Sequence, residues 1–296
     1  MAPRPLLRTA YWSDPPSKAA FRDLARDSFG LDFSAWDEAG YWDDDFRPFT
    51  FFDAEGRALA NVCAYSMELV VAGQPVRAAQ FSTVATRPEL RRRGLARELV
   101  EAAYAWAHGT GHAFTYLFAN SDAAPFYVAA GFRPWTEQCT ALTLHRAPAP
   151  RAGARSLDLG TSADRALLFA MACEREPVSA ALGARNSRLL MFHALGPLRT
   201  GCLHILPLET VVLFERNGGS LTLHDIVARR VPPLIELLPF LAAESDREIV
   251  FRFLPDRLGS LSALGTASQR AFDNGLHVRG AVPLPPVTLF PATSQA

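Results

Sequence analysis

Apolar side chains in the first 86 residues change from helical spacing to the nearly continuous runs that are typical of buried strands. Over residues 17–29 they recur on one helix face, at Ala20, Phe21, Leu24, Ala25 and Phe29. A second short helix is expected at 34–42. Turn residues at Glu55-Gly56 and at Gly73 separate the apolar runs that follow. The pattern therefore predicts three strands, at 49–53, 58–71 and 76–85.

The next segment returns to helical spacing. Residues 91–108 place apolar side chains on one face, with Gly109 available as the C-cap, so we expect an amphipathic helix packed on the sheet. A strand ending at Asn120, a helix around Tyr127 and two strands within 132–145 are predicted to complete one layered unit. These elements define an α+β class with a mixed, mostly antiparallel sheet flanked by helices.

The second half repeats this order coarsely after a Pro/Ala/Gly-rich segment. Helices are predicted near 165–173, 189–195 and 233–243, and strands near 202–206, 209–216, 221–227 and 248–254. We therefore predict a weak internal duplication. The expected division is a first domain at 1–146, a linker at 147–156 and a smaller second domain at 157–296.

Composition narrows the function. Thirty basic and thirty acidic residues give a formal net charge of +0, which argues against a nucleic-acid-binding protein. We expect a cytoplasmic protein that does not associate with membranes, because no apolar run reaches the ~18 residues of a membrane span. The four cysteines lie far apart and are expected to be free thiols, mostly buried. None of the seven histidines has a partner at metal-ligand spacing, so no metal is expected.

The strand-to-helix junction at 84–97 carries the strongest chemical signal. Backbone N–H groups at a helix start and the positive end of the helix dipole form an anion site. Gly94 lets a phosphate approach without a Cβ in the way, and Arg91, Arg92 and Arg93 add positive charge. The string is neither a Walker loop nor a dinucleotide fingerprint. An ordinary solvated arginine-rich helix start is the alternative interpretation.

Three motifs in order make the chain resemble the GCN5-related N-acetyltransferase (GNAT) superfamily. They are the V-x-x-x-P-x-x-R-x-x-G-x-A turn from Val84 to Ala96, Asn120 at the end of the next strand, and the A-P-F-Y-x-x-x-G-F helix from Ala124 to Phe132. The resemblance implies a GNAT fold and a catalytic first domain that binds acetyl-CoA as co-substrate. It also implies transfer of the acetyl group to a primary amine by direct attack on the thioester.

The resemblance also assigns roles to residues. Backbone groups of the strand end would hold the acetyl carbonyl and pantetheine, the turn would hold the pyrophosphate, and Asn120 would hold the pantetheine arm. Tyr127 would lie beside the sulfur as a hydrogen-bond donor, because a phenol of pKa ~10 is a weaker acid than a thiol of pKa ~8.5. The implied cofactor-binding residues are Val84, Ala85, Thr86, Arg91, Arg92, Arg93, Gly94, Leu95, Ala96, Arg97 and Asn120.

Other interpretations of the same residues stay open. Tyr127 could be an amphipathic core tyrosine, and Asn120 could cap the following helix. Arg91 could contact only solvent. The general base is not identified: Glu68 is the leading side-chain candidate, followed by Asp44, Asp45, Asp122, a water molecule or the carboxylate of Ala296.

The second half departs from the motif. Its equivalent junction, 225–233, lacks the glycine and carries prolines where N–H donors would be needed. We therefore predict the tandem form of the superfamily, with a degenerate second GNAT-like half, similar in part to the enhanced-intracellular-survival acetyltransferases.

The acceptor is expected to be a small-molecule or peptide amine. The aspartates and the aromatic residues Trp12, Trp36, Tyr41 and Trp42 within 11–53 would form an acidic, aromatic wall that favours a cation, or else an acidic loop over an aromatic core. A homodimer is an open alternative. Two other functions also remain: a non-catalytic acyl-CoA-binding sensor, and an interaction protein whose cofactor site is vestigial.

Overall fold

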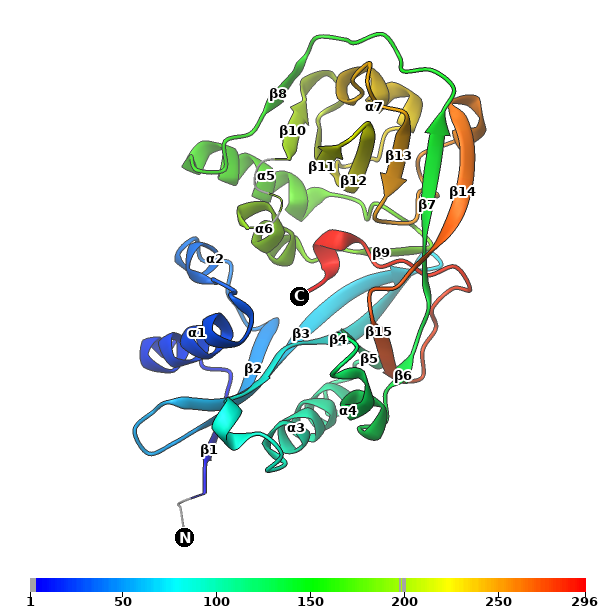
Figure 1. Ribbon diagram of the computed structural model, residues 1–296. Helices are drawn as coiled ribbons and strands as arrows, with labels where there is room; N and C mark the ends of the chain where they lie inside the picture. The colour runs from blue at the N-terminus through cyan, green and yellow to red at the C-terminus, as the bar shows by residue number, and fades with distance from the viewer. Residues whose placement is uncertain (1–3, 197, 199–200) are drawn as a thin grey trace.

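The computed structural model describes residues 4–196, 198 and 201–296 (Figure 1). The first half contains β1 (Leu6–Thr9), α1 (Pro15–Phe29), α2 (Ser34–Glu38), β2 (Phe46–Phe52), β3 (Ala58–Val71), β4 (Gln74–Thr86), the short 3-10 helix η1 (Pro88–Leu90), α3 (Leu95–Gly109), β5 (Phe114–Phe118), α4 (Ala124–Ala129), β6 (Arg133–Pro134) and β7 (Glu137–Leu144). The second contains β8 (Ala154–Ser156), α5 (Ser162–Glu174), β9 (Leu182–Ala184), α6 (Ser187–Leu195), β10 (Cys202–Ile205), β11 (Thr210–Asn217), β12 (Ser220–Val227), α7 (Leu234–Leu241), β13 (Glu248–Phe251), β14 (Gly265–Phe272) and β15 (Leu276–Gly280).

The predicted elements are present with small shifts at their ends. Helix α3 begins at Leu95 rather than at residue 91, because Arg92 and Gly94 have φ values of 62° and 83° and so form a turn. Gly109 lies inside this helix and Thr110 is the C-cap, so the predicted cap was wrong by one residue. Strands β1, β8, β9, β14 and β15 were not predicted.

Two mixed sheets form the molecule. The first contains β9 and β15 from the second half of the chain, and the second contains β7 from the first half. The first sheet has the order β1-β2-β3-β4-β5-β15-β6, with β9 paired to β3, and the second has β14-β7-β13-β12-β11-β10-β8. Strand β15 therefore lies between β5 and β6, while β7 pairs with β13 and β14. Figure 1 shows β7 leaving the first half and β15 returning to it.

This exchange changes the predicted organisation. The strands expected within 132–145 do not complete the first sheet as a pair, because β7 belongs to the second sheet. A boundary at residue 146 therefore does not separate the two sheets, and β8 forms within the expected linker. Local composition marks the exposed crossing segment but carries no information on which strands pair across it. The division at 146 and 157 as functional units stays a prediction.

The two sheets share one topology, which confirms the predicted internal repeat. Each has a parallel pair joined by a helix: β4 and β5 by α3, and β12 and β13 by α7. Each then receives the exchanged strand beside the second member of that pair. Both sheets also have an irregular register beside the first strand of the pair, opposite Asn61 to Cys63 in β3 and opposite Leu213 to Phe214 in β11.

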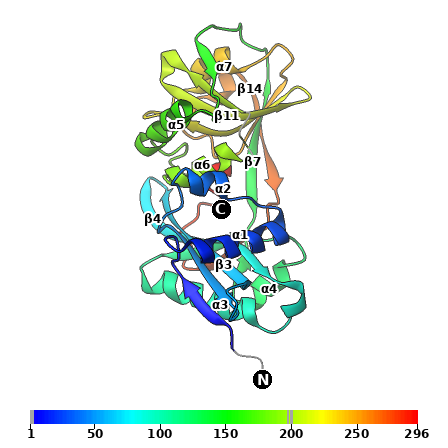
Figure 2. The ribbon, with the colours of Figure 1, turned by 90° about the vertical axis from the view of Figure 1, so that its left-hand side faces the viewer.

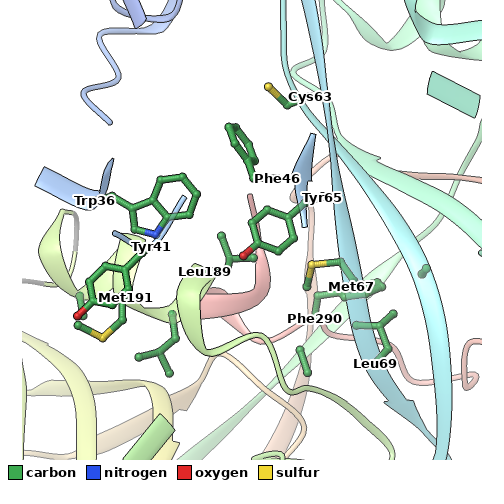
Figure 3. Packing of buried hydrophobic residues seen from close by; sticks show 14 of the residues in the cluster. Trp36, Tyr41, Phe46, Cys63, Tyr65, Met67, Leu69, Leu189, Met191 and Phe290 are labelled. Atoms are coloured by element: carbon green, nitrogen blue, oxygen red, sulfur yellow. The ribbon is translucent and has the colours of Figure 1, made fainter. Parts of the chain in front are cut away.

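Hydrophobic clusters lie on both faces of the first sheet. One face packs against α3 and α4. The other faces α1, α2 and the second half, where Trp36, Tyr65 and Phe290 belong to one continuous cluster (Figure 3). Figure 2 shows the halves one above the other with the end of the chain between them. All four cysteines are free, and only Cys173 is exposed.

Glu137 lies at the first residue of β7, where the chain crosses between the sheets. Its side chain is 1% exposed, and its Oε1 accepts a hydrogen bond of 2.9 Å from the Phe290 N–H. Burial raises the pKa of Glu137 to about 7, although the Phe290 N–H and Arg252 oppose this.

The pKa of Glu137 predicts a pH-dependent stability. A folded-state pKa above the ordinary value means that the folded protein binds the proton more tightly, so stability falls as the pH rises from about 4.5 to about 7. We expect Glu137→Gln, which keeps an acceptor for Phe290, to raise the free energy of unfolding at pH 8 by roughly 2 kcal/mol and to change it little at pH 5. Urea unfolding at both pH values measures this. An equal gain in Glu55→Gln, on an exposed hairpin turn, would contradict the assignment.

Among the described residues, no helix is both long and apolar enough to cross a membrane.

Candidate active site

The two parallel strands of the first sheet separate near their carboxyl ends. Their register runs from Ala78 opposite Phe114 to Phe81 opposite Leu117. Beyond this pair β5 continues for one residue, whereas β4 continues to Thr86 and stays paired with β3 on its other side. The edge of β4 over residues 82–86 that faces β5 is thereby left without a strand partner, and such main-chain groups can bind an extended ligand.

A buried asparagine holds the irregular part of β4. Thr83 has a φ of 50°, a strained value for a β-branched residue. The Asn61 amide donates to the Thr83 carbonyl at 2.9 Å and accepts from the Thr50 hydroxyl at 2.6 Å. Asn61 is 0% exposed. The sequence interpretation missed this residue, although a lone amide within the apolar run 58–71 is a signal that could have identified it.

The turn after β4 presents main-chain donors as expected. Gly94 is the N-cap of α3, and the first helical bond joins the Glu98 N–H to the Gly94 carbonyl at 3.0 Å. Over residues 92–97 no N–H group has an acceptor among the described residues. A Cβ on Gly94 would meet nothing within 4 Å, so the space above the turn is open. These features fit a diphosphate.

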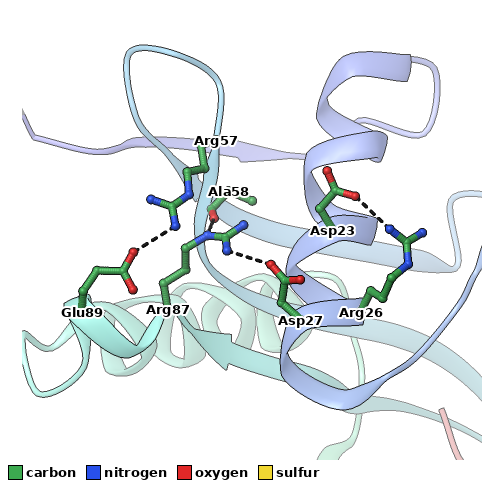
Figure 4. Close-up of polar contacts among 7 residues, drawn as sticks. All are labelled: Asp23, Arg26, Asp27, Arg57, Ala58, Arg87 and Glu89. Carbon is green, nitrogen blue, oxygen red and sulfur yellow. Dashed lines mark hydrogen bonds and ion pairs between the residues drawn. The ribbon is translucent and has the colours of Figure 1, made fainter.

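Some arginines at or near the turn form ion pairs within the protein, and others form none with a described residue. The Arg87 guanidinium donates to the Ala58 carbonyl at 2.8 Å and pairs with Asp27 of α1 at 3.0 Å, while Arg57 pairs with Glu89 at 3.0 Å (Figure 4). These contacts anchor the start of the turn to α1 and β3. Within the described part of the chain no ion pair involves the exposed arginines of the turn and helix start, which are Arg91, Arg92, Arg93 and Arg97.

Asn120 caps the turn that leads into α4, in agreement with the capping interpretation. Its Oδ1 accepts from the Ala123 N–H at 2.9 Å. Its Nδ2 has no partner among the described side chains and main-chain groups, and the residue is exposed. The amide can therefore cap the turn and donate to a ligand at the same time.

Tyr127 is buried in α4 on the face that points toward α3. Its ring lies 5.0 Å from Phe126 and 6.0 Å from Phe132, centroid to centroid. Burial raises the pKa of Tyr127 to about 12, so the phenol is neutral throughout the ordinary working range. Val84, Leu95 and Tyr127 belong to one hydrophobic cluster, so the strand end, the turn and α4 pack together. These three elements are here called the candidate cofactor site.

A cleft of about 1050 Å³ lies on the other side of α4. Asn120 and Val128 line it together with His277 of the exchanged strand β15. The His277 ring is 6.5 Å from the Tyr127 ring, centroid to centroid. The sequence interpretation did not single out His277, because its position beside α4 depends on the strand exchange.

The opposite face of the sheet carries a row of buried polar groups. Tyr65 of β3, Gln80 of β4 and Tyr116 of β5 lie opposite one another in register, and Ser82 follows on β4. The Tyr65 hydroxyl, Gln80 Oε1, Ser82 Oγ and the Tyr116 hydroxyl are buried without a hydrogen-bond partner among the described residues. A buried polar atom without a partner costs about 1–3 kcal/mol, so this row is suited to bind a polar ligand.

The candidate bases differ in position. Glu68, Asp44 and Asp122 are exposed, and strand alternation directs Glu68 to the face opposite Tyr65. Asp45 lies just before β2. Burial raises the pKa of the Tyr65 phenol well above its ordinary value, and the charges of Asp43 and Asp45 raise it further. Burial, with smaller contributions from Asp43 and Glu68, raises the pKa of Asp45 itself to about 6.

The residues expected to wall the acceptor side are largely core and ion-paired residues. Trp36, Tyr41 and Trp42 are buried, and Asp43 pairs with Arg188 of α6. The structure therefore agrees with an acidic loop over an aromatic core.

The corresponding junction of the second half is filled by the protein's own carboxylates. Glu176 accepts from the Val231 N–H at 2.5 Å, and its other oxygen pairs with Arg257 at 2.8 Å. Pro233 is the N-cap of α7. Glu176 therefore occupies the Val231 N–H, where an anion would otherwise bind, and the prolines reduce the number of donors at this junction, as the sequence indicated. No group of three or more potential metal ligands occurs in the described ranges.

Comparison with known proteins agrees with this geometry. A family model described as "Acetyltransferase (GNAT) domain" matches residues 18–135. The chain is similar to a conserved protein of Enterococcus faecalis described as a probable N-acyltransferase, with 14% identity, coverage of 93% of this chain and 72% of that one, and a TM-score of 0.60. It is also similar to Eis1 from Mycobacterium abscessus (18%, 93% and 73%, 0.58) and to a GCN5-related N-acetyltransferase from Anabaena variabilis (14%, 93% and 72%, 0.55). No curated protein matches it.

Residues 18–135 thus match a GNAT acetyltransferase domain, and the fold over 93% of the chain is similar to that of these larger proteins. Acyl transfer is the class of reaction that this domain supports.

Proposed function

We propose that the protein transfers an acetyl group from acetyl-CoA to a primary amine. The supporting observation is that the edge of β4 without a strand partner and the N–H groups of residues 92–97, which have no acceptor among the described residues, lie in the same packed unit as Tyr127. Together these groups offer donors for a pyrophosphate, an edge for a pantetheine arm and a phenol for a sulfur.

The chemistry requires each group in one role. A neutral amine attacks the thioester carbonyl, the C–N bond forms, the C–S bond breaks, and the amine proton is transferred to a base or to water. Proton transfer from Tyr127, with its pKa of about 12, to a thiolate of pKa ~8.5 is uphill by about 5 kcal/mol. Tyr127 therefore donates a hydrogen bond to the developing thiolate and keeps its proton.

The assay that tests this function measures thiol release from acetyl-CoA with pooled amines, alongside calorimetry with acetyl-CoA alone. Binding together with amine-dependent release supports the proposal. Binding without release across the panel would indicate a non-catalytic acyl-CoA sensor. Absence of binding at millimolar ligand would indicate an interaction protein with a vestigial site.

Asp45 is the carboxylate whose position and pKa best suit the base. If it accepts the amine proton, kcat/KM falls as the pH decreases through about 6, because the carboxylate is then protonated. We expect Asp45→Asn to lower the rate at pH 8 and to abolish this acidic limb. The matched control is Asp44→Asn, on the exposed neighbouring residue. An unchanged limb in Asp45→Asn would assign the proton transfer to another group or to water.

A further inference from the structure

The last nine residues form a buried segment between the two halves, here called the closing segment (residues 288–296). Leu289 and Phe290 are 0% exposed, and Thr293 is 1% exposed. Both ribbon views place this segment between the sheets (Figures 1 and 2). Its polar contacts come from both halves of the chain, including Glu137 of β7 and Asp225 of β12.

The closing segment covers the polar row on the first sheet. The Phe290 ring stacks on Tyr116 with centroids 4.4 Å apart and planes 19° apart. The Gln80 amide donates to the Ala296 carbonyl oxygen at 3.4 Å. Gln80 and Tyr116 face each other one position before β4 and β5 separate. The segment therefore lies where an amine would approach a thioester held along β4, on the face opposite α3.

Two buried side chains of the second half hold this segment. The Thr293 hydroxyl donates to Asp225, whose carboxylate also accepts from Arg175 at 2.6 Å and from the Ile226 N–H at 2.8 Å. His193 Nε2 lies 2.7 Å from the Gln295 carbonyl, which can only accept, so this nitrogen carries the proton. Asp225 is 0% exposed. The Arg175 guanidinium compensates its charge, and this ion pair together with the Ile226 N–H fixes the orientation of the carboxylate.

Asp225 lies at a position of the second sheet that corresponds to the irregular part of β4 in the first sheet. It follows His224 at the irregular part of β12, the strand that corresponds to β4. In the first sheet this position leaves the edge of β4 beside the candidate cofactor site without a strand partner. In the second sheet Asp225 accepts from Thr293 of the closing segment, and Glu176 accepts from the Val231 N–H in the neighbouring turn.

We propose that Asp225 and His193 are positioning residues that hold the closing segment against β4 and β5 as a wall of the acceptor site, and that this is the task of the degenerate second half. The inference rests on the proposed acetyl transfer for its acceptor site, but the holding of the segment is a physical property that can be measured separately.

The test uses Thr293→Val, which removes the hydroxyl and keeps the shape. The matched control is Thr210→Val, at a fully buried threonine of the second half whose hydroxyl donates to the Leu208 carbonyl at 2.8 Å, away from the segment. We expect amide hydrogen exchange at Ala292 and Ser294 to accelerate about tenfold in Thr293→Val relative to Thr210→Val. Thr293→Ser, which restores the hydroxyl, should return exchange to the wild-type rate.

The kinetic arm uses spermidine, glucosamine and a lysine-containing peptide, and continues with the amine that gives the fastest thiol release. In Thr293→Val the KM for this amine should rise about tenfold, with the dissociation constant of acetyl-CoA unchanged. Thr293→Ser should restore the KM, because a merely structural defect would not follow the hydroxyl.

The outcomes separate the two proposals. Unchanged exchange at Ala292 and Ser294 in Thr293→Val overturns the holding role whatever the activity. Faster exchange with an unchanged amine KM overturns the acceptor wall and leaves acetyl transfer intact. If the wild-type protein neither binds acetyl-CoA nor releases thiol, the proposed function fails, and the acceptor wall fails with it.

Discussion

We expect Gly94→Ala to bind acetyl-CoA up to about a hundredfold more weakly than the wild-type protein. Gly94 has a φ of 83°, and a Cβ in the left-handed region costs about 1–2 kcal/mol of folding stability whether or not the ligand is bound. The methyl group meets no protein atom within 4 Å, so its further effect falls on the ligand that approaches the turn. Loss of one charge-assisted hydrogen bond to a phosphate costs about 1.5–3 kcal/mol, which by itself corresponds to a roughly ten- to hundredfold loss of affinity.

Calorimetric titration of acetyl-CoA measures the affinity, and a second glycine near the same helix supplies the control. Gly111 follows the other end of α3 and has a φ of 82°, and a Cβ at this position would likewise meet nothing within 4 Å. Gly111→Ala should lose a similar amount of folding stability and keep its acetyl-CoA affinity. Equal affinities in the two variants would show that the main chain at the start of α3 does not bind the pyrophosphate.

We expect Tyr127→Phe to lower kcat about a hundredfold, within the usual range for loss of a positioned donor, and to leave the dissociation constant of acetyl-CoA nearly unchanged. The ring stays in the cluster with Phe126 and Phe132, so the packing is kept and only the donor is removed. Burial holds the pKa of Tyr127 at about 12, so any alkaline limb below pH 10 must arise from another group and persist in the variant.

Pre-steady-state thiol release and equilibrium binding separate the two effects. Tyr104→Phe, on a half-buried tyrosine of α3 that stacks with His108, is the matched control and should retain full turnover. Wild-type turnover in Tyr127→Phe would remove the phenol from the reaction and favour the core interpretation of this residue.

The parts of the site that depend on neighbouring residues could be predicted from the sequence. The turn at Gly94 and the helix after it follow from consecutive residues, because φ preferences and unpaired N–H groups at a helix start are local properties. The position of Tyr127 on a short helix after Asn120 is equally local. The role of Asn61 was in principle detectable, but the carbonyl it supports belongs to Thr83 on another strand.

Long-range pairing could not be predicted in the same way. The exchange of β7 and β15 pairs strands that are more than a hundred residues apart in the chain. The hydrophobic pattern of each strand is compatible with either sheet, so the pattern alone does not specify the partner. The engagement of Arg87 with Asp27 has the same origin, since an arginine near a turn has no local feature that distinguishes an ion-paired side chain from a free one.

The sequence by itself therefore determined most of the helices and strands, the repeat and the open turn at Gly94, since hydrophobic period, glycine placement and prolines act over a few residues. Only the tertiary structure decided that β15 completes the first sheet, that Glu176 fills the degenerate junction and that Asp225 binds Thr293. These contacts form when segments far apart in the chain are buried together, and each buried charge must then find a partner that no local pattern specifies.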